Sequence, residues 1–79
     1  MRIAYTNYAE ETLIVRKISK GEVELAFLNP EEIADGKEGR KIAHKTFGSK
    51  LLRVIFETEG NAYIVITAYY TNPERYMGK

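Results

Sequence analysis

Residues 50–70, KLLRVIFETEGNAYIVITAYY, are the most informative part of the sequence for the fold. Two runs rich in β-branched and aromatic residues flank Glu59-Gly60, and this pattern predicts two antiparallel strands joined by a tight turn. Arg53 is a single charge inside the first run. Because an unpaired buried charge is very costly, Arg53 must face water, a partner or a counter-charge. The stretch therefore predicts a sheet and indicates where a functional face lies.

Length, composition and charge limit the class of protein. The 79 residues suffice for one small domain and 44% hydrophobic residues suffice for a core, so we expect one domain over residues 1–79. The absence of cysteine excludes disulfides and thiolate metal sites. It also suits a cytoplasmic protein without a membrane partner, as do short apolar runs and a start unlike a signal peptide. With a net charge of +1, contact with RNA would need a local basic cluster.

The first helix is predicted over about residues 8–17, after a short strand or lead-in over residues 1–6. Thr6 or Asn7 can cap it, because short polar side chains accept hydrogen bonds from the first turn of a helix. The residues expected to face the core are Leu13 and Ile14.

A second helix is predicted to begin at Ser19, which has Glu22 three residues later, the spacing of a capping box. Asn29-Pro30 ends it, since the residue before a proline is forced out of the helical region. The side chains with helical spacing on its core face are Val23, Ala26 and Phe27.

Strands are predicted over residues 39–47, 50–58 and 61–70, with a short extended piece around residues 32–34. Helices followed by hairpin-linked strands predict an α+β domain. We expect two N-terminal helices packed on one face of a three- to four-stranded antiparallel sheet.

Two glycine turns predict the strand register. A three-residue loop over residues 58–60 would pair Glu57 with Asn61, since such loops usually end in a left-handed glycine. Gly48-Ser49 fits a two-residue hairpin and places His44 opposite Arg53. The helix-facing residues are then Leu52, Val54, Phe56, Ala62, Ile64, Ile66 and Ala68.

The opposite face of the predicted sheet is polar and partly aromatic. It gathers Arg40, His44, Arg53, Tyr63, Thr67 and Tyr69, with Arg40 opposite Glu57. A slip of one residue would replace His44 by Lys41, Ala43 and Lys45, because alternate residues of a strand point to opposite faces.

In its predicted elements and motifs, the chain resembles the small RelE-like toxins and their BrnT-like relatives. The resemblance spans about residues 7–76 and is carried by three motifs: S-x-x-E-V-x-x-x-x-x-N-P-E-E-I (19–33), LRVI (52–55) and VITAY (65–69). It implies a sheet face that binds and cuts RNA without metal or cofactor, and an antitoxin protein as partner. Arg16 matches a basic position of the first helix. Two positions depart, since relatives often carry His at Tyr8 and Arg at Thr12, and these departures weaken the expectation of RNA cleavage.

Four residues are candidates for catalysis. Arg53 could grip or stabilise a phosphate, or it could pair with Glu57 or Glu59. His44 could serve as general acid or base, although an ordinary strand residue on a solvated face is the favoured interpretation. Tyr69 could stack on a base or orient a hydroxyl, or simply pack. The C-terminal end of the RelE-like toxins suggests Arg75 as a second phosphate-stabilising residue.

The RNA-binding candidates come from the one local basic cluster, which also contains Lys37, and from the C-terminal segment. They are Arg40, Lys41, Lys45 and Tyr76. Such a cluster attracts phosphates, but it is also an ordinary solvated surface. The glutamates, Glu32 included, are interpreted as the surface of the helices and their surroundings rather than a catalytic pair, so acidic helices contrast with basic strands.

The sequence thus predicts the toxin component of a toxin–antitoxin system, a metal-independent endoribonuclease that acts on RNA. The alternative is a non-catalytic protein- or RNA-binding domain of the same fold. A homodimer that covers part of a sheet edge is a third interpretation, because exposed edges invite pairing.

Overall fold

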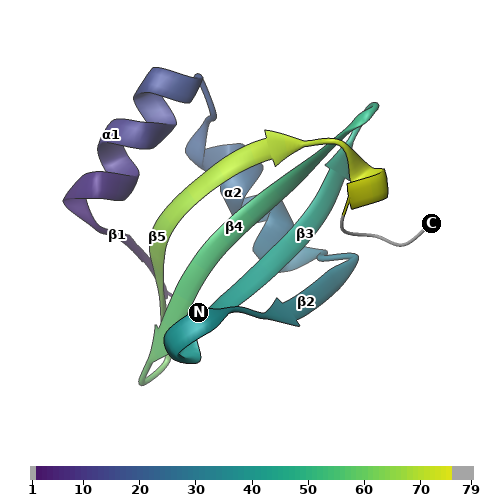
Figure 1. Ribbon diagram of the computed structural model, residues 1–79. Helices are drawn as coiled ribbons and strands as arrows, with labels where there is room; N and C mark the ends of the chain where they lie inside the picture. Colours follow the sequence, from purple (N-terminus) through teal and green to yellow (C-terminus); the bar gives the residue numbers. More distant parts are fainter. Residues whose placement is uncertain (1, 76–79) are drawn as a thin grey trace.

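The computed structural model describes residues 2–75. For Arg75 it describes only the backbone. A five-stranded mixed sheet with strand order β1-β5-β4-β3-β2 is combined with two α-helices (Figure 1). The elements in chain order are β1 (Arg2–Tyr5), α1 (Asn7–Arg16), α2 (Lys20–Leu28), β2 (Glu32–Asp35), the 3₁₀ turn η1 (Lys37–Gly39), β3 (Lys41–Phe47), β4 (Lys50–Glu59), β5 (Ala62–Thr71) and the 3₁₀ turn η2 (Pro73–Arg75).

The α+β class is confirmed, but the prediction of a purely antiparallel sheet of three to four strands was wrong. β1 pairs in parallel with β5, from Arg2 opposite Ala62 to Tyr5 opposite Val65. β2, at the extended piece expected over residues 32–34, lies antiparallel to β3 at the other edge, so β1 is the strand beyond the predicted number. The parallel pair joins opposite ends of the chain, and no local pattern in a sequence encodes such a pairing.

Both helices begin as their capping residues predict. Thr6 is the N-cap of α1, and its hydroxyl accepts a 3.0 Å hydrogen bond from the backbone N–H of Ala9. Ser19 and Glu22 form the predicted capping box of α2, with reciprocal hydrogen bonds of 3.1 and 2.7 Å. These bonds satisfy N–H groups that the first turn of a helix leaves unpaired.

The helices do not simply cover one face of the sheet. α2 lies behind the sheet in the view of Figure 1, whereas α1 lies alongside β5, beyond the end of β1. The N–H of Thr6 donates to the Val65 carbonyl at 3.1 Å, and the Arg16 guanidinium donates to the Ala68 carbonyl at 2.9 Å. α1 thus satisfies backbone groups at the edge of β5 that β1 is too short to reach.

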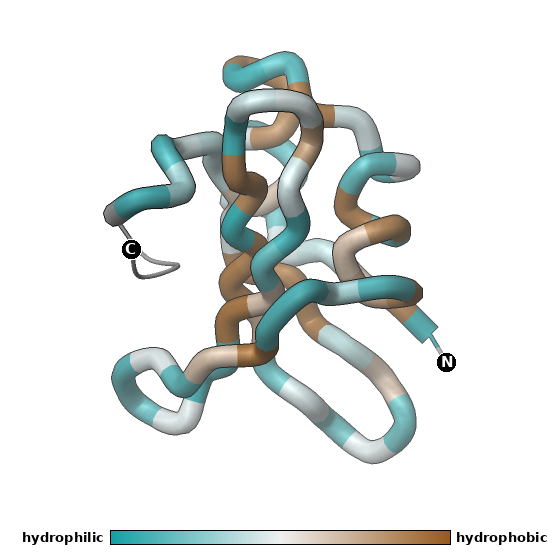
Figure 2. Tube along the Cα trace, turned by 90° about the vertical axis from the view of Figure 1, so that its right-hand side faces the viewer, coloured by the Kyte–Doolittle hydropathy of each residue, from teal (hydrophilic) through white to brown (hydrophobic). Residues whose placement is uncertain are grey.

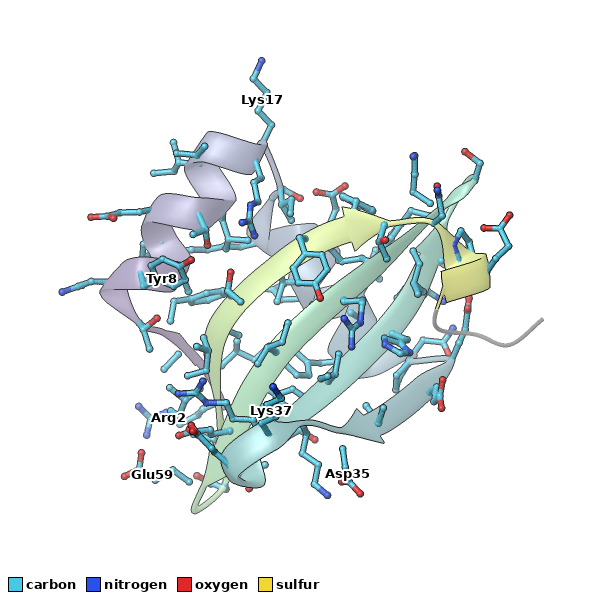
Figure 3. The ribbon with its side chains drawn as sticks, in the orientation of Figure 1. Arg2, Tyr8, Lys17, Asp35, Lys37 and Glu59 are labelled. Carbon is cyan, nitrogen blue, oxygen red and sulfur yellow. The ribbon has the colours of Figure 1, made fainter. Side chains whose placement is uncertain are left out.

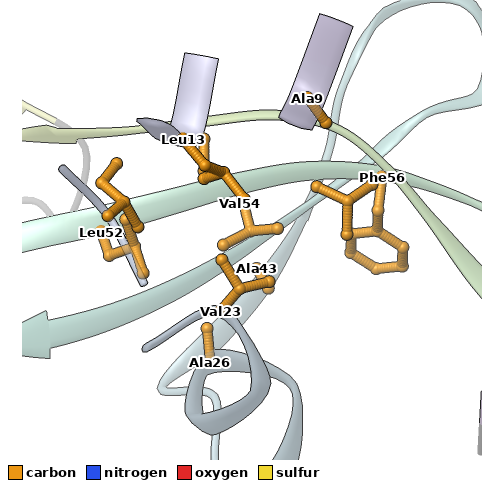
Figure 4. Close-up of a cluster of buried hydrophobic side chains, with 11 residues drawn as sticks. Ala9, Leu13, Val23, Ala26, Ala43, Leu52, Val54 and Phe56 are labelled. Carbon is orange, nitrogen blue, oxygen red and sulfur yellow. The ribbon is translucent and has the colours of Figure 1, made fainter. Parts of the chain in front are cut away.

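The core lies between the helices and one face of the sheet (Figure 4). α1 contributes Ala9 and Leu13, which are buried, but Ile14 is 76% exposed, so its predicted place in the core was wrong. A helix at a sheet edge buries a narrow stripe, and Ile14 lies one residue outside it. The buried apolar residues of the cluster are Ala9, Leu13, Ile18, Val23, Ala26, Ala43, Leu52, Val54, Phe56, Val65 and Ala68.

The β3–β4 hairpin has the predicted register, with His44 opposite Arg53 and a turn at Gly48-Ser49. Gly48 has a positive φ of 63°, a conformation that glycine adopts without strain. In Figure 2 the turns at the lower end of the tube are white to teal, whereas brown segments concentrate in the strands and helices. The hydropathy pattern therefore follows the division into turns and regular elements.

The β4–β5 hairpin corrects the predicted register. Glu59 pairs with Ala62 across a two-residue turn, so the three-residue loop was wrong. The register then shifts between Ile55, opposite Thr67, and Phe56, opposite Val65. Ile66 is thus an extra residue, a β-bulge that reverses the alternation of side chains.

Because of the bulge, the side chains in the first half of β5 point to the opposite face from the one predicted. Tyr63 packs against the core and stacks on Phe27 at 4.5 Å between ring centroids, so its predicted place on the opposite face was wrong. Past the bulge the predicted alternation holds, with Ala68 toward the core and Tyr69 opposite Arg53.

Candidate functional site

A row of polar side chains crosses the sheet on the face turned away from α2, which we call the outer face. It takes one residue from each of four strands: Glu32 of β2, His44 of β3, Arg53 of β4 and Tyr69 of β5. Each residue is the direct cross-strand partner of the next. Cross-strand partners on one face have neighbouring Cβ atoms, so the register alone brings these side chains together.

Hydrogen bonds connect the whole row. The Glu32 carboxylate lies 3.2 Å from Nδ1 of His44, and Nε of Arg53 donates to Nε2 of His44 at 3.0 Å. Nη1 of Arg53 donates to the Tyr69 hydroxyl. The guanidinium carbon of Arg53 also lies 5.5 Å from the centroid of the Tyr69 ring, within the range of a cation–π interaction.

A second cation reaches the same tyrosine from α1. The guanidinium carbon of Arg16 lies 5.8 Å from the centroid of the Tyr69 ring. Its Nη1 is held by the Ala68 carbonyl at 2.9 Å and the Thr67 hydroxyl at 3.5 Å. An open pocket lies here, lined by Arg16, Ile18, Tyr69 and Tyr70. Two guanidinium groups beside one phenol make this part of the surface suited to an anion.

The outer face is more enclosed than a solvated sheet surface. His44 is only 2% exposed, so its interpretation as a residue on a solvated face was wrong. Ile42 and Leu51, on the same alternation of their strands, are 8% and 0% exposed. Arg53 and Tyr69 are partly exposed, and Arg16 is exposed. A ligand on this face would therefore meet the arginines and Tyr69 before the imidazole.

The predicted basic cluster is not gathered on the outer face. Arg40 forms a 3.0 Å ion pair with Glu57. Lys41 and Lys45 lie on the same alternation of β3 as the buried Ala43, toward α2, and Lys41 forms a 2.8 Å ion pair with Asp35. The reason is the confirmed register, which turns His44 to the outer face and alternate residues away from it.

Two further lysines, Lys37 and Lys17, lie away from the polar row of the outer face (Figure 3). Lys37 is on η1, at the end of the sheet where Glu59 also lies (Figure 3). Lys17 follows α1 and points away from the body of the protein (Figure 3). Of the C-terminal candidates, the side chain of Arg75 and the whole of Tyr76 lie outside the described residues.

Tyr70 closes the pocket beside Tyr69 and belongs to the structural framework. Its hydroxyl donates to the Glu22 carboxylate at 2.8 Å, which ties β5 to the first turn of α2. Burial, together with this carboxylate, raises the pKa of Tyr70 to about 12. Hydrogen bonds from Ser19 and Tyr70 lower the pKa of Glu22. Tyr70 therefore keeps its proton at neutral pH and is unsuited to act as a base.

Sequence reasoning missed Glu32 as a member of the site. The sequence assigns it to the acidic surface around the helices, whereas it begins β2 and reaches His44. The available signal was the short extended piece after Pro30, which starts at Glu32 and could have been paired with the strand that follows. Arg16 was noticed only through the resemblance, and its contact with Tyr69 depends on the packing of α1 along β5.

Two findings concern metals and membranes. Within residues 2–75, no group of three or more His, Asp or Glu side chains could hold a metal ion. None of the helices in that range is long and apolar enough to cross a lipid bilayer.

Comparison with known proteins identifies a family. The model of DUF4258, a domain of unknown function, matches residues 5–70, and the chain belongs to this family. No curated protein and no solved structure matches it. Glu32, His44, Arg53 and Tyr69 all lie in the matched region. Since the family description states no activity, the function must be inferred from the outer face itself.

Proposed function

We propose that this protein is a RelE-like toxin component, a metal-independent endoribonuclease whose site is the outer face around Arg53. The observation that carries the proposal is a pair of guanidinium groups, those of Arg53 and Arg16, which both contact one partly exposed tyrosine, Tyr69. Arginine suits RNA phosphates because its planar fork donates two parallel hydrogen bonds.

The proposed reaction is the attack of a ribose 2′-hydroxyl on the adjacent phosphorus. The 2′-oxygen forms a bond to phosphorus, the bond from phosphorus to the 5′-oxygen breaks, and a 2′,3′-cyclic phosphate results. The proton of the 2′-hydroxyl passes to solvent, and the leaving 5′-oxygen takes one up from water. These steps require only positioning and stabilisation of charge.

Four residues have a role in this proposal. Arg53 stabilises the negative charge that develops on the phosphate, with Arg75 as the second such group. The Tyr69 hydroxyl, next to Arg53, orients the 2′-hydroxyl. Arg16 holds a neighbouring phosphate of the same strand. The proposal also includes the fold of the RelE-like toxins, in which a pair of helices packs on a twisted sheet.

An antitoxin protein is the proposed partner. Exposed apolar side chains on α1 support it, since the neighbours Ile14 and Val15 are 76% and 78% exposed. Apolar side chains exposed side by side mark protein contacts. Leu28, the last residue of α2, is 80% exposed but lies on the other helix.

A non-catalytic RNA-binding or protein-binding domain is the second candidate. The observation that favours it is the burial of His44, which at 2% exposure offers no accessible imidazole as acid or base. Binding requires only the arginines and Tyr69, which are more exposed.

Induced expression and an RNA cleavage assay in EDTA test the proposal. Wild-type protein should arrest growth and cleave single-stranded RNA to cyclic phosphate ends, and Arg53→Ala should do neither. Lys50→Ala is the matched control, since it removes a positive charge from the same strand at a side chain that binds Asn72. RNA binding without cleavage would favour the second candidate, and absence of both binding and cleavage would exclude both RNA functions.

A further inference from the structure

Both ring nitrogens of His44 form hydrogen bonds, and the donor or acceptor character of each partner determines where the imidazole carries its proton. An ionised carboxylate such as Glu32 only accepts hydrogen bonds, and a guanidinium only donates them. Nδ1 of His44 faces the carboxylate and Nε2 faces the Nε–H of Arg53. The imidazole therefore carries its proton on Nδ1 and presents the lone pair of Nε2 to Arg53.

A protonated imidazole does not fit this arrangement. An imidazolium has a hydrogen on each nitrogen, so Nε2–H would point at the Nε–H of Arg53. The close approach of Glu32 and His44 is accordingly a hydrogen bond from Nδ1–H of the neutral ring to the carboxylate rather than an ion pair. Through this ring, the negative charge of Glu32 and the positive charge of Arg53 are connected by two directed hydrogen bonds.

The row also fixes the orientation of Arg53. The Nε end of the guanidinium is held by His44 and the Nη1 end contacts the Tyr69 hydroxyl. An arginine has many rotamers, and ordering such a side chain costs free energy when a ligand binds. A guanidinium that is already oriented avoids much of this cost.

We infer that Glu32 and His44 are positioning residues, which lock the imidazole as the Nδ1–H tautomer so that Nε2 orients the Arg53 guanidinium. The effect on RNA rests on the proposed function, whereas the tautomer and the orientation of Arg53 do not. Neither Glu32 nor His44 is a catalytic residue here, because neither would touch the reacting atoms.

Nitrogen NMR of the imidazole tests the lock directly. His44 is the only histidine in the chain, so its two ring nitrogens give unambiguous signals. Free neutral histidine favours the Nε2–H tautomer. Wild-type protein at pH 7.5 should instead show Nδ1–H, with a slowly exchanging Nε–H signal from Arg53. An Nε2–H tautomer or an imidazolium in the wild type would overturn the inference.

Variants of Glu32 show whether it sets the tautomer. Its side chain is 48% exposed, so replacement should leave the fold intact, which cannot be assumed for the buried His44. Glu32→Ala should shift the ring toward Nε2–H and speed exchange of the Arg53 Nε–H. Glu32→Gln, which keeps an acceptor, should preserve the Nδ1–H form. An unchanged spectrum in Glu32→Ala would exclude positioning by Glu32.

Glu31→Ala is the matched control. It removes the same charge one residue earlier, where the carboxylate accepts a 2.6 Å hydrogen bond from Thr46 instead. Its imidazole spectrum should equal that of the wild type. If it shifts the tautomer as Glu32→Ala does, the cause is loss of charge in general and the inference is wrong.

Binding of a fluorescein-labelled single-stranded RNA supplies the functional measurement. Because misplacement of a binding group by about an ångström is costly, Glu32→Ala should weaken binding by about tenfold or more. Glu32→Gln and Glu31→Ala should stay close to the wild type. If the wild type binds no RNA, the proposed function fails and the NMR spectra still decide the positioning inference. If the wild type binds and Glu32→Ala binds equally, the positioning inference fails alone.

Discussion

The two faces of the sheet are built on different physical principles. Toward α2, the contacts are apolar and come from both α-helices and from the strands, with Leu52, Val54 and Ala68 all at 0% exposure. On the outer face, hydrogen bonds connect four polar groups in a row: a carboxylate, an imidazole, a guanidinium and a phenol. Burial of apolar area stabilises the fold without specifying direction, whereas hydrogen bonds specify direction at a desolvation cost.

We therefore expect stability and ligand recognition to depend on different residues. Substitutions on the α2 side should unfold the protein without a specific effect on ligands. Substitutions in the polar row should change recognition more than stability. The expected effects range from a loss of several kcal/mol in the core to a small dependence of stability on pH.

The adjacent leucines Leu51 and Leu52 provide the sharpest test, since both are at 0% exposure and point to opposite faces. Leu52→Ala should lower the free energy of unfolding by about 2–5 kcal/mol, as expected for a cavity in a packed core. Leu51→Ala should cost less, because Leu51 lies outside the core cluster. Urea unfolding measures both. Equal losses would show that the outer face contains a second core of equal weight.

Tyr69→Phe separates the hydroxyl from the ring. The aromatic ring and its cation–π contacts with Arg16 and Arg53 remain, so RNA affinity should change little. Cleavage should fall by about a hundredfold, the scale on which misplacement of a reacting group lowers a rate. Single-turnover cleavage and fluorescence anisotropy measure the two quantities. Undiminished cleavage would remove the Tyr69 hydroxyl from the proposed mechanism.

Ser19→Ala tests the local capping of α2. The Ser19 hydroxyl accepts from the N–H of Glu22 at 3.1 Å, and loss of such a cap costs about 1 kcal/mol. Thermal unfolding should show this decrease, whereas the tautomer of His44 should be unchanged. A change in the imidazole spectrum would mean that the two faces are coupled through the sheet.

The pH dependence of stability should show the smallest effect. The pKa of Glu22 is lowered in the fold, by hydrogen bonds from Ser19 and Tyr70. Its contribution is therefore present above the ordinary carboxyl pKa of 4.5 and is lost as the pH falls below it. The pKa of Tyr70 is raised from 10.0 to about 12, so its contribution is present below pH 10 and is lost between there and about 12.

Melting temperatures across the acid range check this prediction. The advantage of wild type over Glu22→Gln should shrink between pH 6 and pH 3. An advantage that stays constant with pH would show that the carboxylate form of Glu22 is not what the fold selects.

Much of the fold was predictable because its signals are local. The capping box at Ser19 involves residues three apart, and the Gly48-Ser49 turn sets the register of β3 against β4. That turn is sufficient to place His44 opposite Arg53, because a two-residue loop leaves one register for the strands that it joins. Two of the four residues in the polar row, His44 and Arg53, could therefore be paired from this one glycine turn.

The rest of the row depended on features without a local signal. The bulge at Ile66 returns Tyr69 to the outer face while it turns Tyr63 to the core, although simple alternation would put both on one face. Glu32 could be assigned only once β2 was known to pair with β3 rather than to continue the surface around α2.

Local signals along the chain specify the helix starts, the β3–β4 hairpin and the choice of Arg53 as the charge to explain. These features depend on groups a few residues apart, whose geometry the backbone restricts to few alternatives. The assembled fold alone sets the parallel pairing of β1, the position of α1 along β5 and the contacts that join Glu32, His44, Arg53 and Tyr69. Those depend on partners far apart in the chain, which many sequences could satisfy equally until the whole sheet is assembled.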